Sequence, residues 1–311
     1  MATVTTLEKA IKKRVSDSNI SCRSMVVTVF GDVVSQHGGW IWLGSLINTL
    51  GLMGYDDRSV RTAVYRLVQS DWLQVQKIGR RSYYCFTDNA ISHYEKAARR
   101  IYAGKQPPWD GSWTLVAPAF VAEDKKDELR KSLVWQGFNT LVTGMYAHPS
   151  SDRTSLDETL CEQGLKTDVV VMSAKTEDKH SQEAMKQLVK NRWNLDELEQ
   201  GYSDFLRYYQ RKSQPFTQRL PAAEKPSATE CFLMRILLVH EYRRMLLRDP
   251  DLPDAMLPKG WVGQEAHKLV KHLYKRLAKQ SIAFIQADLD NAEGPLPAPE
   301  SSFYKRFDGL P

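Results

Sequence analysis

The sequence has few cysteines, and their arrangement suits neither a disulfide framework nor a zinc site. The four cysteines of this 311-residue chain stand at positions 22, 85, 161 and 231, without a C-x-x-C pair. Long apolar runs are missing too, since none approaches the roughly 20 residues that span a bilayer. The N-terminus also lacks the charged-then-apolar pattern of a secretory signal. These absences predict a cytoplasmic protein in a reducing compartment, with no membrane partner.

Signatures of common hydrolases and nucleotide-dependent enzymes are absent as well. There is no G-x-S-x-G, no phosphate-cradling glycine loop and no dinucleotide fingerprint. His267 and His272 are five residues apart, which does not place two metal ligands on one helical face. The stretch that begins at His240 lacks the second histidine of the zincin motif. The sequence therefore predicts a protein that is not an enzyme and that uses no metal or cofactor.

Excess positive charge is lacking in the last two thirds of the chain. Residues 1–105 carry 15 Lys and Arg against 8 Asp and Glu, whereas residues 106–311 carry 28 against 29. The whole net charge of +6 therefore originates in the first third. Neutralisation of phosphates by basic residues supplies most of the non-specific affinity for DNA, so this distribution favours a duplex-binding module at the N-terminus. Chance variation of surface charge is the alternative.

Three helices are predicted in this basic first third. Apolar residues recur at helical spacing in residues 24–36 and again in residues 40–50, with glycines after each run. Asp56 and Asp57 offer N-caps to a third helix, which continues to residue 69. One face of this third helix is apolar, which indicates that it packs against the other two.

A β-hairpin is predicted directly after the third helix. Residues 73–78 and 82–86 have the composition of two short strands, and Gly79 lies in the turn between them. Three helices followed by a hairpin with a basic tip form a winged helix-turn-helix. We expect such a DNA-binding domain over residues 22–88.

The third helix carries an unusual polar face, and the hairpin tip carries two arginines. Guanidinium, hydroxyl and amide groups read base edges in the major groove, while a basic tip reaches phosphates or the minor groove. An ordinary helix and hairpin with solvated charges are the structural alternative. The residues predicted to contact DNA are Arg58, Ser59, Arg61, Thr62, Tyr65, Arg66, Gln69, Arg80 and Arg81.

The middle of the chain alternates strands with helices. Strands are predicted at residues 113–121, 140–146 and 168–172, with helices at 124–135 and 156–161 between them. This alternation within a short span indicates a small α+β sandwich of ferredoxin-like type.

The chain as a whole is predicted to be an α+β multidomain protein. Residues 1–20 are polar and charged, and a loosely held arm is expected there. The expected order after the winged helix is a helical linker over residues 89–105, the ferredoxin-like domain over 106–175 and a helical domain over 176–286. Residues 287–311 are rich in Pro, Asp, Glu and Ser, which predicts a loosely ordered tail.

Several motifs resemble those of the PaaX family of repressors of phenylacetate degradation operons. In the first third they are Val60 to Val68, Trp72-Leu73, Gly79-Arg80 and Tyr83 to Thr87. Later motifs that agree are Trp193 to Leu198 with Tyr202 and Phe205, His240 to Arg244, Arg248 to Pro253 and Leu257 to Gly263. The similarity extends over about residues 20–285, and the C-terminal motifs are its most distinctive part.

This resemblance implies a repressor with a GntR-like winged helix. A member of the family is expected to act as a homodimer, to bind a palindromic double-stranded operator and to release it when phenylacetyl-coenzyme A binds. The effector is implied by the family alone, because neither composition nor periodicity names it. The family also does not fix which residues contact the thioester.

Residues for this effector were therefore inferred from chemistry. A coenzyme A thioester needs cationic donors and an apolar slot, and the C-terminal motifs supply both. His240, Arg243 and Arg244 share one helical face, and Trp261 follows a turn. The alternative for the cluster is an ion-pair network that holds helices together. For Trp261 the alternative is a side chain that fills the core.

Two rival functions remain open at this level. One is a metal-dependent nucleic-acid phosphodiesterase, because the middle domain also resembles the spacer-acquisition nucleases of CRISPR systems, which use an acidic metal ligand near the end of the first strand. Glu123 and Asp124 lie near that point, but they serve equally well at the start of a helix. The other rival is a DNA-binding scaffold that responds to no ligand.

Overall fold

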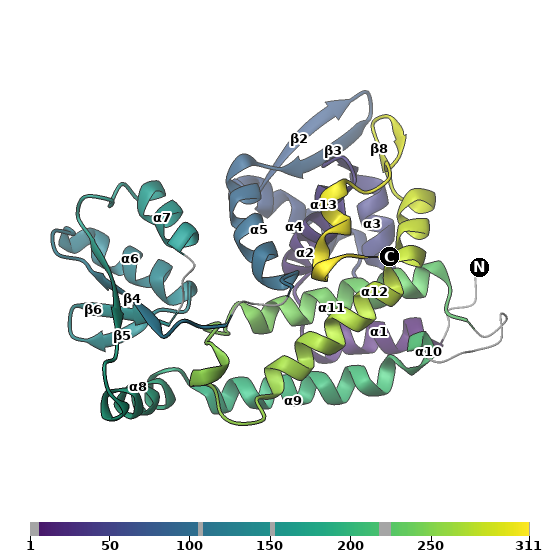
Figure 1. Ribbon diagram of the computed structural model, residues 1–311. Coiled ribbons are helices and arrows are strands. Elements are labelled where there is room, and N and C mark those ends of the chain that lie inside the picture. The colour runs from purple at the N-terminus through teal and green to yellow at the C-terminus, as the bar shows by residue number, and fades with distance from the viewer. Residues whose placement is uncertain (1–5, 105–107, 150–152, 218–224, 311) are drawn as a thin grey trace. The chain divides into compact units, whose positions relative to one another are not determined.

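The computed structural model describes residues 6–104, 108–149, 153–217 and 225–310, and it mixes many helices with small sheets (Figure 1). The chain divides into two compact units rather than into consecutive domains. The first comprises Met1–Lys105, Leu206–Arg243 and His267–Pro311, and the second comprises Gln106–Phe205 and Arg244–Ala266. Within the described ranges, no helix is both long and apolar enough to cross a membrane.

The first unit begins with a helical bundle in which α2 packs against α4. The side chain of Ser21 accepts a hydrogen bond from the Ser24 amide at the start of α2, and Asp56 caps α4 in the same way. Apolar residues of both helices lie in one core with those of α3. The elements are α2 (Cys22–Asp32), η1 (Val34–Gln36), β1 (Ile41–Trp42), α3 (Leu43–Leu52), α4 (Asp57–Gln69) and α5 (Asp88–Ile101).

The predicted hairpin is present as β2 (Leu73–Ile78) and β3 (Arg81–Phe86). β3 is the central strand of a sheet of order β1-β3-β2. Ile78 pairs with Arg81, so the connecting turn consists of Gly79 and Arg80 alone. Gly79 has φ +58°, a backbone conformation that glycine adopts at little cost. Only Arg80 therefore lies at the tip, whereas Arg81 is the first residue of β3.

The prediction of a loose arm over residues 1–20 is wrong for its described part. Thr6–Asp17 form helix α1, in which Ile11 and Val15 are buried. Arg14 pairs with Glu241 at 2.8 Å. The high proportion of charged residues hid two apolar positions, Ile11 and Val15, that lie one helical turn apart.

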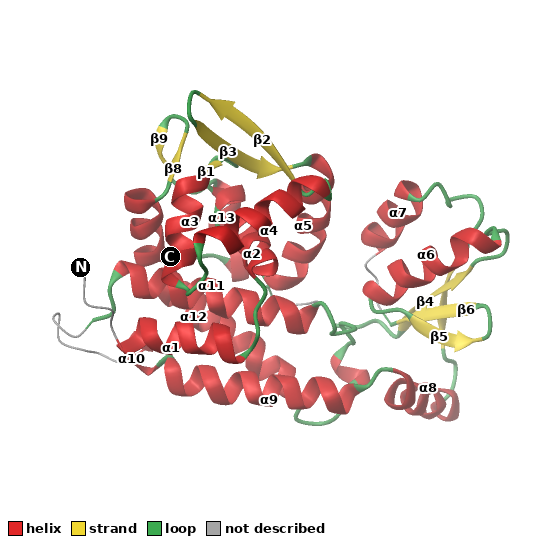
Figure 2. Cartoon of the chain, turned by 180° about the vertical axis from the view of Figure 1, so that it is seen from behind, coloured by secondary structure: helices red, strands yellow, loops and turns green. Residues whose placement is uncertain are grey.

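The second unit contains a four-stranded sheet with α6 and α7 on one face (Figure 2). Its strand order is β5-β6-β4-β7 and every pair is antiparallel. The single strand predicted over residues 140–146 is in fact a hairpin that turns at Gly144, with φ +79°. The elements are β4 (Ser112–Ala117), α6 (Glu123–Trp135), β5 (Asn139–Val142), β6 (Met145–His148), α7 (Arg153–Glu162) and β7 (Val170–Lys175).

The helical segment predicted over residues 176–286 is present, but it does not form one separate domain. Its residues are shared between the two compact units. The linker predicted over residues 89–105 is mainly occupied by α5, and Lys105 lies outside the described residues. The remaining helices are α8 (Lys179–Arg192), α9 (Leu195–Lys212), α10 (Gln214–Thr217), α11 (Ala228–Leu246), η3 (Asp254–Met256) and α12 (Val262–Asp288).

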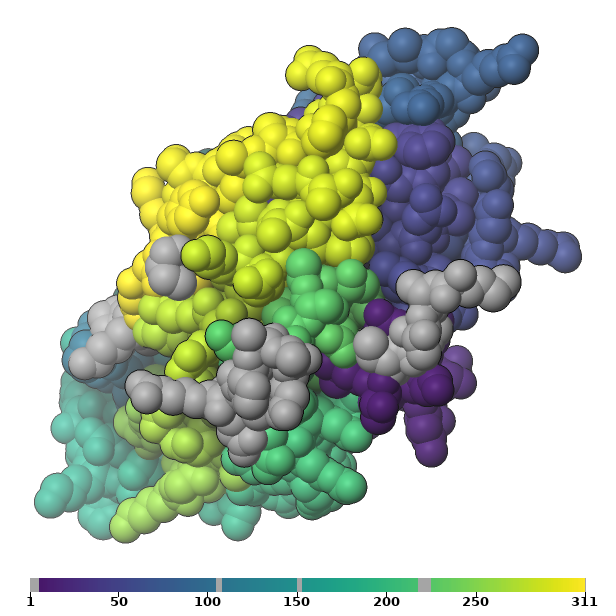
Figure 3. All heavy atoms as spheres, turned by 90° about the vertical axis from the view of Figure 1, so that its right-hand side faces the viewer, coloured from purple at the N-terminus to yellow at the C-terminus, as the bar shows by residue number. Residues whose placement is uncertain are grey.

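The prediction of a loosely ordered tail over residues 287–311 is also wrong for its described part, which ends at residue 310. After α12 the chain forms β8 (Asp290–Asn291), β9 (Gly294–Pro295), α13 (Ser301–Tyr304) and η4 (Arg306–Asp308). Leu289, Leu296, Phe303 and Phe307 are buried, and they anchor the segment. In Figure 3 the C-terminal residues (yellow) lie directly against the N-terminal third (purple to blue). A few bulky apolar residues thus outweigh a polar, proline-rich composition.

Candidate nucleic-acid interface

The outer face of α4 is polar and open to solvent. Val60, Val64 and Leu67 are buried on the opposite face, which fixes the rotation of the helix. Tyr65 is 64% exposed, which is unusual for so large an aromatic side chain. Further residues predicted to contact DNA that are exposed on this helix are Arg58, Arg61, Thr62, Arg66 and Gln69.

The arginines of the predicted interface differ in what they contact. Among the described residues, the guanidinium groups of Arg58, Arg66 and Arg80 have no hydrogen-bond or ion-pair partner. Arg61 instead pairs with Asp57 at 2.6 Å, although both side chains are 58% exposed. Exposed pairs of this kind contribute about 0–1 kcal/mol, so Arg61 can exchange its partner for a phosphate at small cost.

Ser59 serves the start of α4. Its backbone amide donates to Asp56 Oδ1 at 2.8 Å, and its hydroxyl donates to Asp56 Oδ2 at 3.0 Å. These two bonds lower the pKa of the Asp56 carboxyl. The Ser59 hydroxyl proton is thus already used within the helix cap, and only the oxygen lone pairs remain for a contact.

The two hairpin arginines are in different environments. Arg80 is exposed in the two-residue turn, and Figure 1 shows the hairpin extending beyond the helices of its unit. The Arg81 guanidinium carbon lies over the Trp42 ring, 4.4 Å from its centroid. A stacked guanidinium of this kind is held in place by cation–π attraction. Arg80 is therefore the free cation of the tip, and Arg81 is partly committed to the sheet.

Sequence reasoning missed two cations near this surface. Lys77 is exposed on β2, one residue before the strand ends. Arg23 donates to the Ser70 hydroxyl at 3.0 Å and thereby reaches the C-terminal end of α4. The position of Lys77 two residues before the Gly79 turn could have signalled it, whereas nothing in the local sequence places Arg23 beside α4.

The residues predicted for an acyl-coenzyme A ligand fall in two different units. In the first unit, His240 is fully buried on α11, with Nδ1 2.9 Å from the Thr28 hydroxyl. Arg243 Nη2 lies 3.2 Å from the Ser24 hydroxyl. Both side chains therefore connect α11 to α2. This agrees with the alternative to ligand binding, in which the cluster is a network that holds helices together.

Arg244 and Trp261 belong to the second unit. Arg244 is exposed, and Trp261 is buried with its ring edge-on to Tyr202 at 6.2 Å. A side chain on Gly263 would collide with the indole nitrogen, so the chain packs tightly around Trp261. The role of these residues in ligand binding stays a prediction.

The acidic residues considered for metal binding start helix α6. Glu123 and Asp124 lie in its first turn, after the N-cap residue Ala122, and Glu123 pairs with Lys126 at 2.6 Å. Acidic side chains in a first turn interact favourably with the helix dipole. Among the described residues, no group of three or more His, Cys, Asp and Glu is arranged to hold a metal ion.

Three family models match the chain in succession. They are "PaaX-like protein" over residues 21–90, "PaaX protein central Cas2-like domain" over 106–186 and "PaaX-like protein C-terminal domain" over 193–287. The chain is also 34% identical over 304 residues to the transcriptional repressor PaaX of Escherichia coli strain K12. That alignment covers 98% of this chain and 95% of the relative. The chain belongs to the PaaX family.

A solved structure shares the fold of this PaaX-family chain. It is that of the uncharacterised protein Rv0674 from Mycobacterium tuberculosis, with a TM-score of 0.50 and 19% identity. The match covers 84% of this chain and 97% of that chain.

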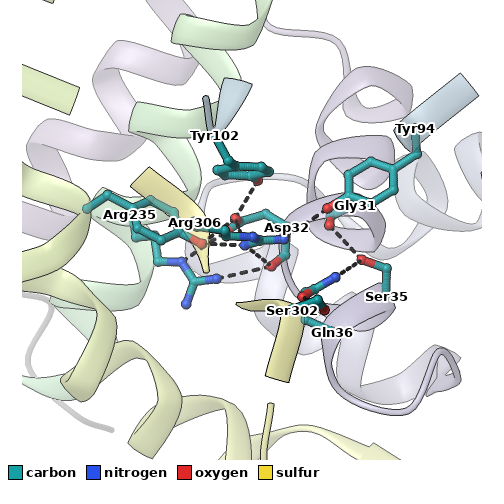
Figure 4. A network of polar contacts seen from close by, with 10 residues as sticks. Gly31, Asp32, Ser35, Gln36, Tyr94, Tyr102, Arg235, Ser302 and Arg306 are labelled. Atoms are coloured by element: carbon teal, nitrogen blue, oxygen red, sulfur yellow. Dashed lines mark hydrogen bonds and ion pairs between the residues drawn. The ribbon is translucent and has the colours of Figure 1, made fainter. Parts of the chain in front are cut away.

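A buried ionic cluster links the PaaX-like N-terminal segment to the C-terminal one (Figure 4). Asp32 at the end of α2 and Arg235 on α11 are both 0% exposed and pair at 2.9 Å. Arg306 of the C-terminal tail pairs with the other Asp32 oxygen at 2.8 Å. Arg306 itself lies beyond the residues that the family models match. No sequence motif indicated this cluster, because its members are far apart along the chain.

Two tyrosine hydroxyls complete the cluster around Asp32. Tyr102 donates to Asp32 Oδ1 at 2.6 Å, and Tyr274 donates to the same oxygen at 2.8 Å. Burial by itself raises the pKa of Asp32, but the charges of Arg235 and Arg306 and the two hydroxyl bonds lower it below its ordinary value. Asp32 is therefore ionised, and it holds together α2, α11, α12 and the tail.

Proposed function

We propose that this chain is a dimeric DNA-binding repressor of a phenylacetate catabolic operon, which phenylacetyl-coenzyme A releases from its operator. One observation carries the DNA-binding part. The exposed face of α4 presents Arg58 and Arg66, whose guanidinium groups have no partner among the described residues, and it does so in a chain of the family to which the E. coli transcriptional repressor belongs. The effector and the dimer come from the sequence resemblance, and the cytoplasmic location comes from the composition and patterning of the sequence.

The proposed domain is a winged helix-turn-helix made of α2, α3, α4 and the β2–β3 hairpin. In it α4 enters the major groove, where Arg58 and Arg66 can each form two hydrogen bonds with a guanine. Arg80 at the wing tip contacts phosphate or the minor groove. The strand order β5-β6-β4-β7 supports our interpretation of the middle domain as ferredoxin-like.

Release requires that the effector prefer the state that does not bind DNA. Moving a repressor from 99% to 1% operator-competent takes a difference in ligand affinity of about 5.5 kcal/mol between the two states. A thioester with several anionic groups and an apolar acyl group can supply such a difference if it binds where the DNA-binding domain meets the rest of its unit.

Substitutions on α4 test the proposal. The probe is a duplex that the wild-type protein selects from a random library, and binding is measured by fluorescence anisotropy. Arg58→Ala and Arg66→Ala should each weaken binding by about 1–3 kcal/mol and relax base preference at one position. Arg276→Ala is the matched control, since Arg276 is exposed on α12 and far from α4 in sequence.

Two outcomes would contradict this function. If both α4 variants bind the selected duplex like wild type, α4 is not the reading helix. If the wild-type protein degrades the duplex when Mg²⁺ or Mn²⁺ is added, the phosphodiesterase alternative gains over the repressor. A repressor shifts the duplex and leaves it intact.

A further inference from the structure

A cavity of about 860 Å³ lies within the first unit, between the hairpin, α5 and the C-terminal tail. None of its lining residues was among those predicted to bind a ligand. Gln74, Cys85 and Phe86 line it from the hairpin, and Glu300, Ser302 and Arg306 line it from the tail. Its volume is within the 300–1,000 Å³ that is usual for small-molecule sites.

One end of the cavity is apolar and aromatic. Trp40 and Phe86 line it, and the Phe86 ring lies 6.0 Å from the ring of Tyr94, whose hydroxyl accepts from Arg306 Nη2 at 2.9 Å. Ile91 lines the same space and is 40% exposed, although it is a large aliphatic side chain. An apolar ring that covered Ile91 would remove this surface from water, which is favourable.

The cavity follows one side of α5 towards a cationic end. Ile91, Ala98 and Tyr102 are spaced seven and four residues apart and thus lie on one helical face. The distance from Ile91 to Tyr102 is about 16 Å at 1.5 Å per residue. Arg99 of α5 and Lys305 and Arg306 of the tail line the cavity near Tyr102. The Arg306 guanidinium lies 3.9 Å from the Tyr102 ring centroid.

The buried charge at this end is positive. Of the six charged residues that line the cavity, only Arg306 is buried. Asp32 is the only carboxylate among the described residues that pairs with Arg235 or Arg306, so two guanidinium groups share one carboxylate. Since burial reduces screening, this end favours an anionic or strongly polar acceptor group. The three exposed carboxylates of the lining are Asp88, Glu95 and Glu300.

We propose that this cavity is the effector site, and that it takes an elongated compound with an apolar ring at one end and anionic groups at the other. The inference rests on the proposed function, because it assigns the place where the effector acts. A thioester of an aromatic acid has this form. Its ring lies against Trp40, Phe86 and Ile91, and its polar groups extend past Arg99 and Lys305.

Binding there acts on the hairpin directly. Gln74 and Cys85 are paired across β2 and β3, and the Gln74 amide donates to the Cys85 sulfur at 3.0 Å. On the opposite side, tail residues are fastened to η1: Ser302 donates to the Gln36 side chain at 2.9 Å, and the Glu300 amide donates to the Gln36 carbonyl at 2.9 Å. A ligand that contacts both sides changes the position of the hairpin relative to the tail, and with it the wing that α4 needs for tight operator binding.

Calorimetry with the full chain tests the site, with phenylacetyl-coenzyme A, phenylacetate and coenzyme A as separate probes. Ala98→Trp fills the cavity, and Lys305→Glu reverses a charge at its cationic end. We expect both variants to bind the thioester at least about tenfold more weakly than wild type, which corresponds to 1.4 kcal/mol. Lys279→Glu is the matched control, because Lys279 is exposed on α12 and does not line the cavity. It should bind like wild type.

Tryptophan fluorescence gives a second readout. Trp40 lines the cavity, so the thioester should change the emission of wild type, and Trp40→Phe should lose that change. Lys305 is exposed, so its substitution tests the site even if Ala98→Trp disturbs folding.

Several results would overturn the site. The first is that both Ala98→Trp and Lys305→Glu bind the thioester with the affinity of wild type. The second is that none of the three probes binds. The third is that coenzyme A binds as tightly as its thioester. Duplex affinity is measured in the same preparations. If both variants bind the duplex and release it on addition of the thioester as wild type does, only the cavity is refuted. If the wild-type protein binds no duplex, the proposed function is refuted.

Discussion

Asp32 shows how much one buried carboxylate can organise. Its two oxygens accept from or pair with Arg235, Arg306, Tyr102 and Tyr274, which come from four different segments. A buried charge is tolerated only when it is paired and hydrogen-bonded, so each of these partners is needed. The aromatic rings around the arginines add cation–π contacts, including Arg235 over Tyr274 at 4.8 Å.

Replacing Asp32 with asparagine should therefore be costly. Asp32→Asn removes the carboxylate that pairs with two buried guanidinium groups, and loss of one partner of a buried pair costs about 3–5 kcal/mol. Urea denaturation measures the change in the free energy of unfolding. Asp57→Asn is the control, since its pair with Arg61 is exposed and should cost less than about 1 kcal/mol. A loss for Asp32→Asn no larger than that of the control would show that the cluster adds no stability.

His37 is a second buried group that fastens the tail. Its Nδ1 lies 2.7 Å from the Pro297 carbonyl oxygen, which can only accept, so Nδ1 carries the proton and donates it. Burial lowers the pKa of His37 to about 4, against the raising effect of the Pro297 carbonyl, and the charge of Arg235 lowers it further. The ring is thus neutral in the folded protein at pH 7.

This neutral histidine predicts a pH dependence of stability. The unfolded chain takes up a proton near the ordinary pKa of about 6.5, whereas the folded chain resists it until about pH 4. Stability is therefore lost as the pH falls from 6.5 to 4, by about 2 kcal/mol at pH 5 if each pKa unit is worth 1.36 kcal/mol. His37→Asn keeps a donor near Nδ1 and does not titrate. The difference in unfolding free energy between pH 7 and pH 5 should be smaller in this variant, and an equal difference would rule His37 out as its source.

At the scale of elements, the hairpin separates two arginines that are adjacent in the sequence. The two-residue turn leaves Arg80 outside the sheet, while the register places Arg81 opposite Ile78. The side chain of Arg81 lies over Trp42. Trp42 belongs to β1, which pairs with β3 on the edge opposite β2. The hairpin thus has one cation that is exposed in its turn and one that also supports the sheet.

Substitutions of the two arginines should differ in kind. Arg80→Ala should lower affinity for all duplex sequences and reduce the log–log salt slope of binding by roughly one unit, without changing the melting temperature. Arg81→Ala should lower the melting temperature as well, because the cation–π contact is lost, at about 0.5–1 kcal/mol. Anisotropy at several salt concentrations and thermal melts measure both effects. An unchanged slope for Arg80→Ala would remove the wing tip from the interface.

The whole first unit depends on segments from both ends of the chain. The tail contributes Phe303 and Phe307, which are fully buried, and Arg306, which is part of the Asp32 cluster. The Phe307 amide also donates to the Tyr102 carbonyl at 3.0 Å. Residues 300–308 are therefore part of the same folded body as α2 and α5.

Removal of the tail should accordingly destabilise the N-terminal helices of the first unit. A chain that ends at residue 299 loses two buried aromatic side chains, for which truncation to alanine costs about 3–5 kcal/mol each. We expect a large fall in melting temperature together with loss of duplex binding. A chain that ends at residue 308 keeps both rings and Arg306 and serves as the control. If the shorter chain melts and binds DNA like the control, the tail is dispensable.

Local pattern was sufficient for much of this fold. Apolar spacing predicted α2 to α4, the pattern after the hairpin predicted the helical linker that α5 occupies and the helical region over residues 176–286, and strand composition predicted the β2–β3 hairpin. The polar face of α4 was also predictable, because burial of Val60, Val64 and Leu67 fixes which residues face solvent. Composition gave the wrong prediction where burial of a few apolar residues anchors a polar segment. Examples are Ile11 and Val15 in α1 and Phe303 and Phe307 in the tail.

The sequence by itself thus determined the helices, the hairpin, the basic first third and the family. Tertiary structure alone decided which charges are available, because pairing depends on neighbours in space. It commits Arg81 to Trp42 and His240 to Thr28, and it leaves Arg58, Arg66 and Arg80 without partners among the described residues. It also brings Asp32, Arg235 and Arg306 together from positions that are more than 70 residues apart along the chain. A buried charge requires its partners nearby in space, and no local pattern records that requirement.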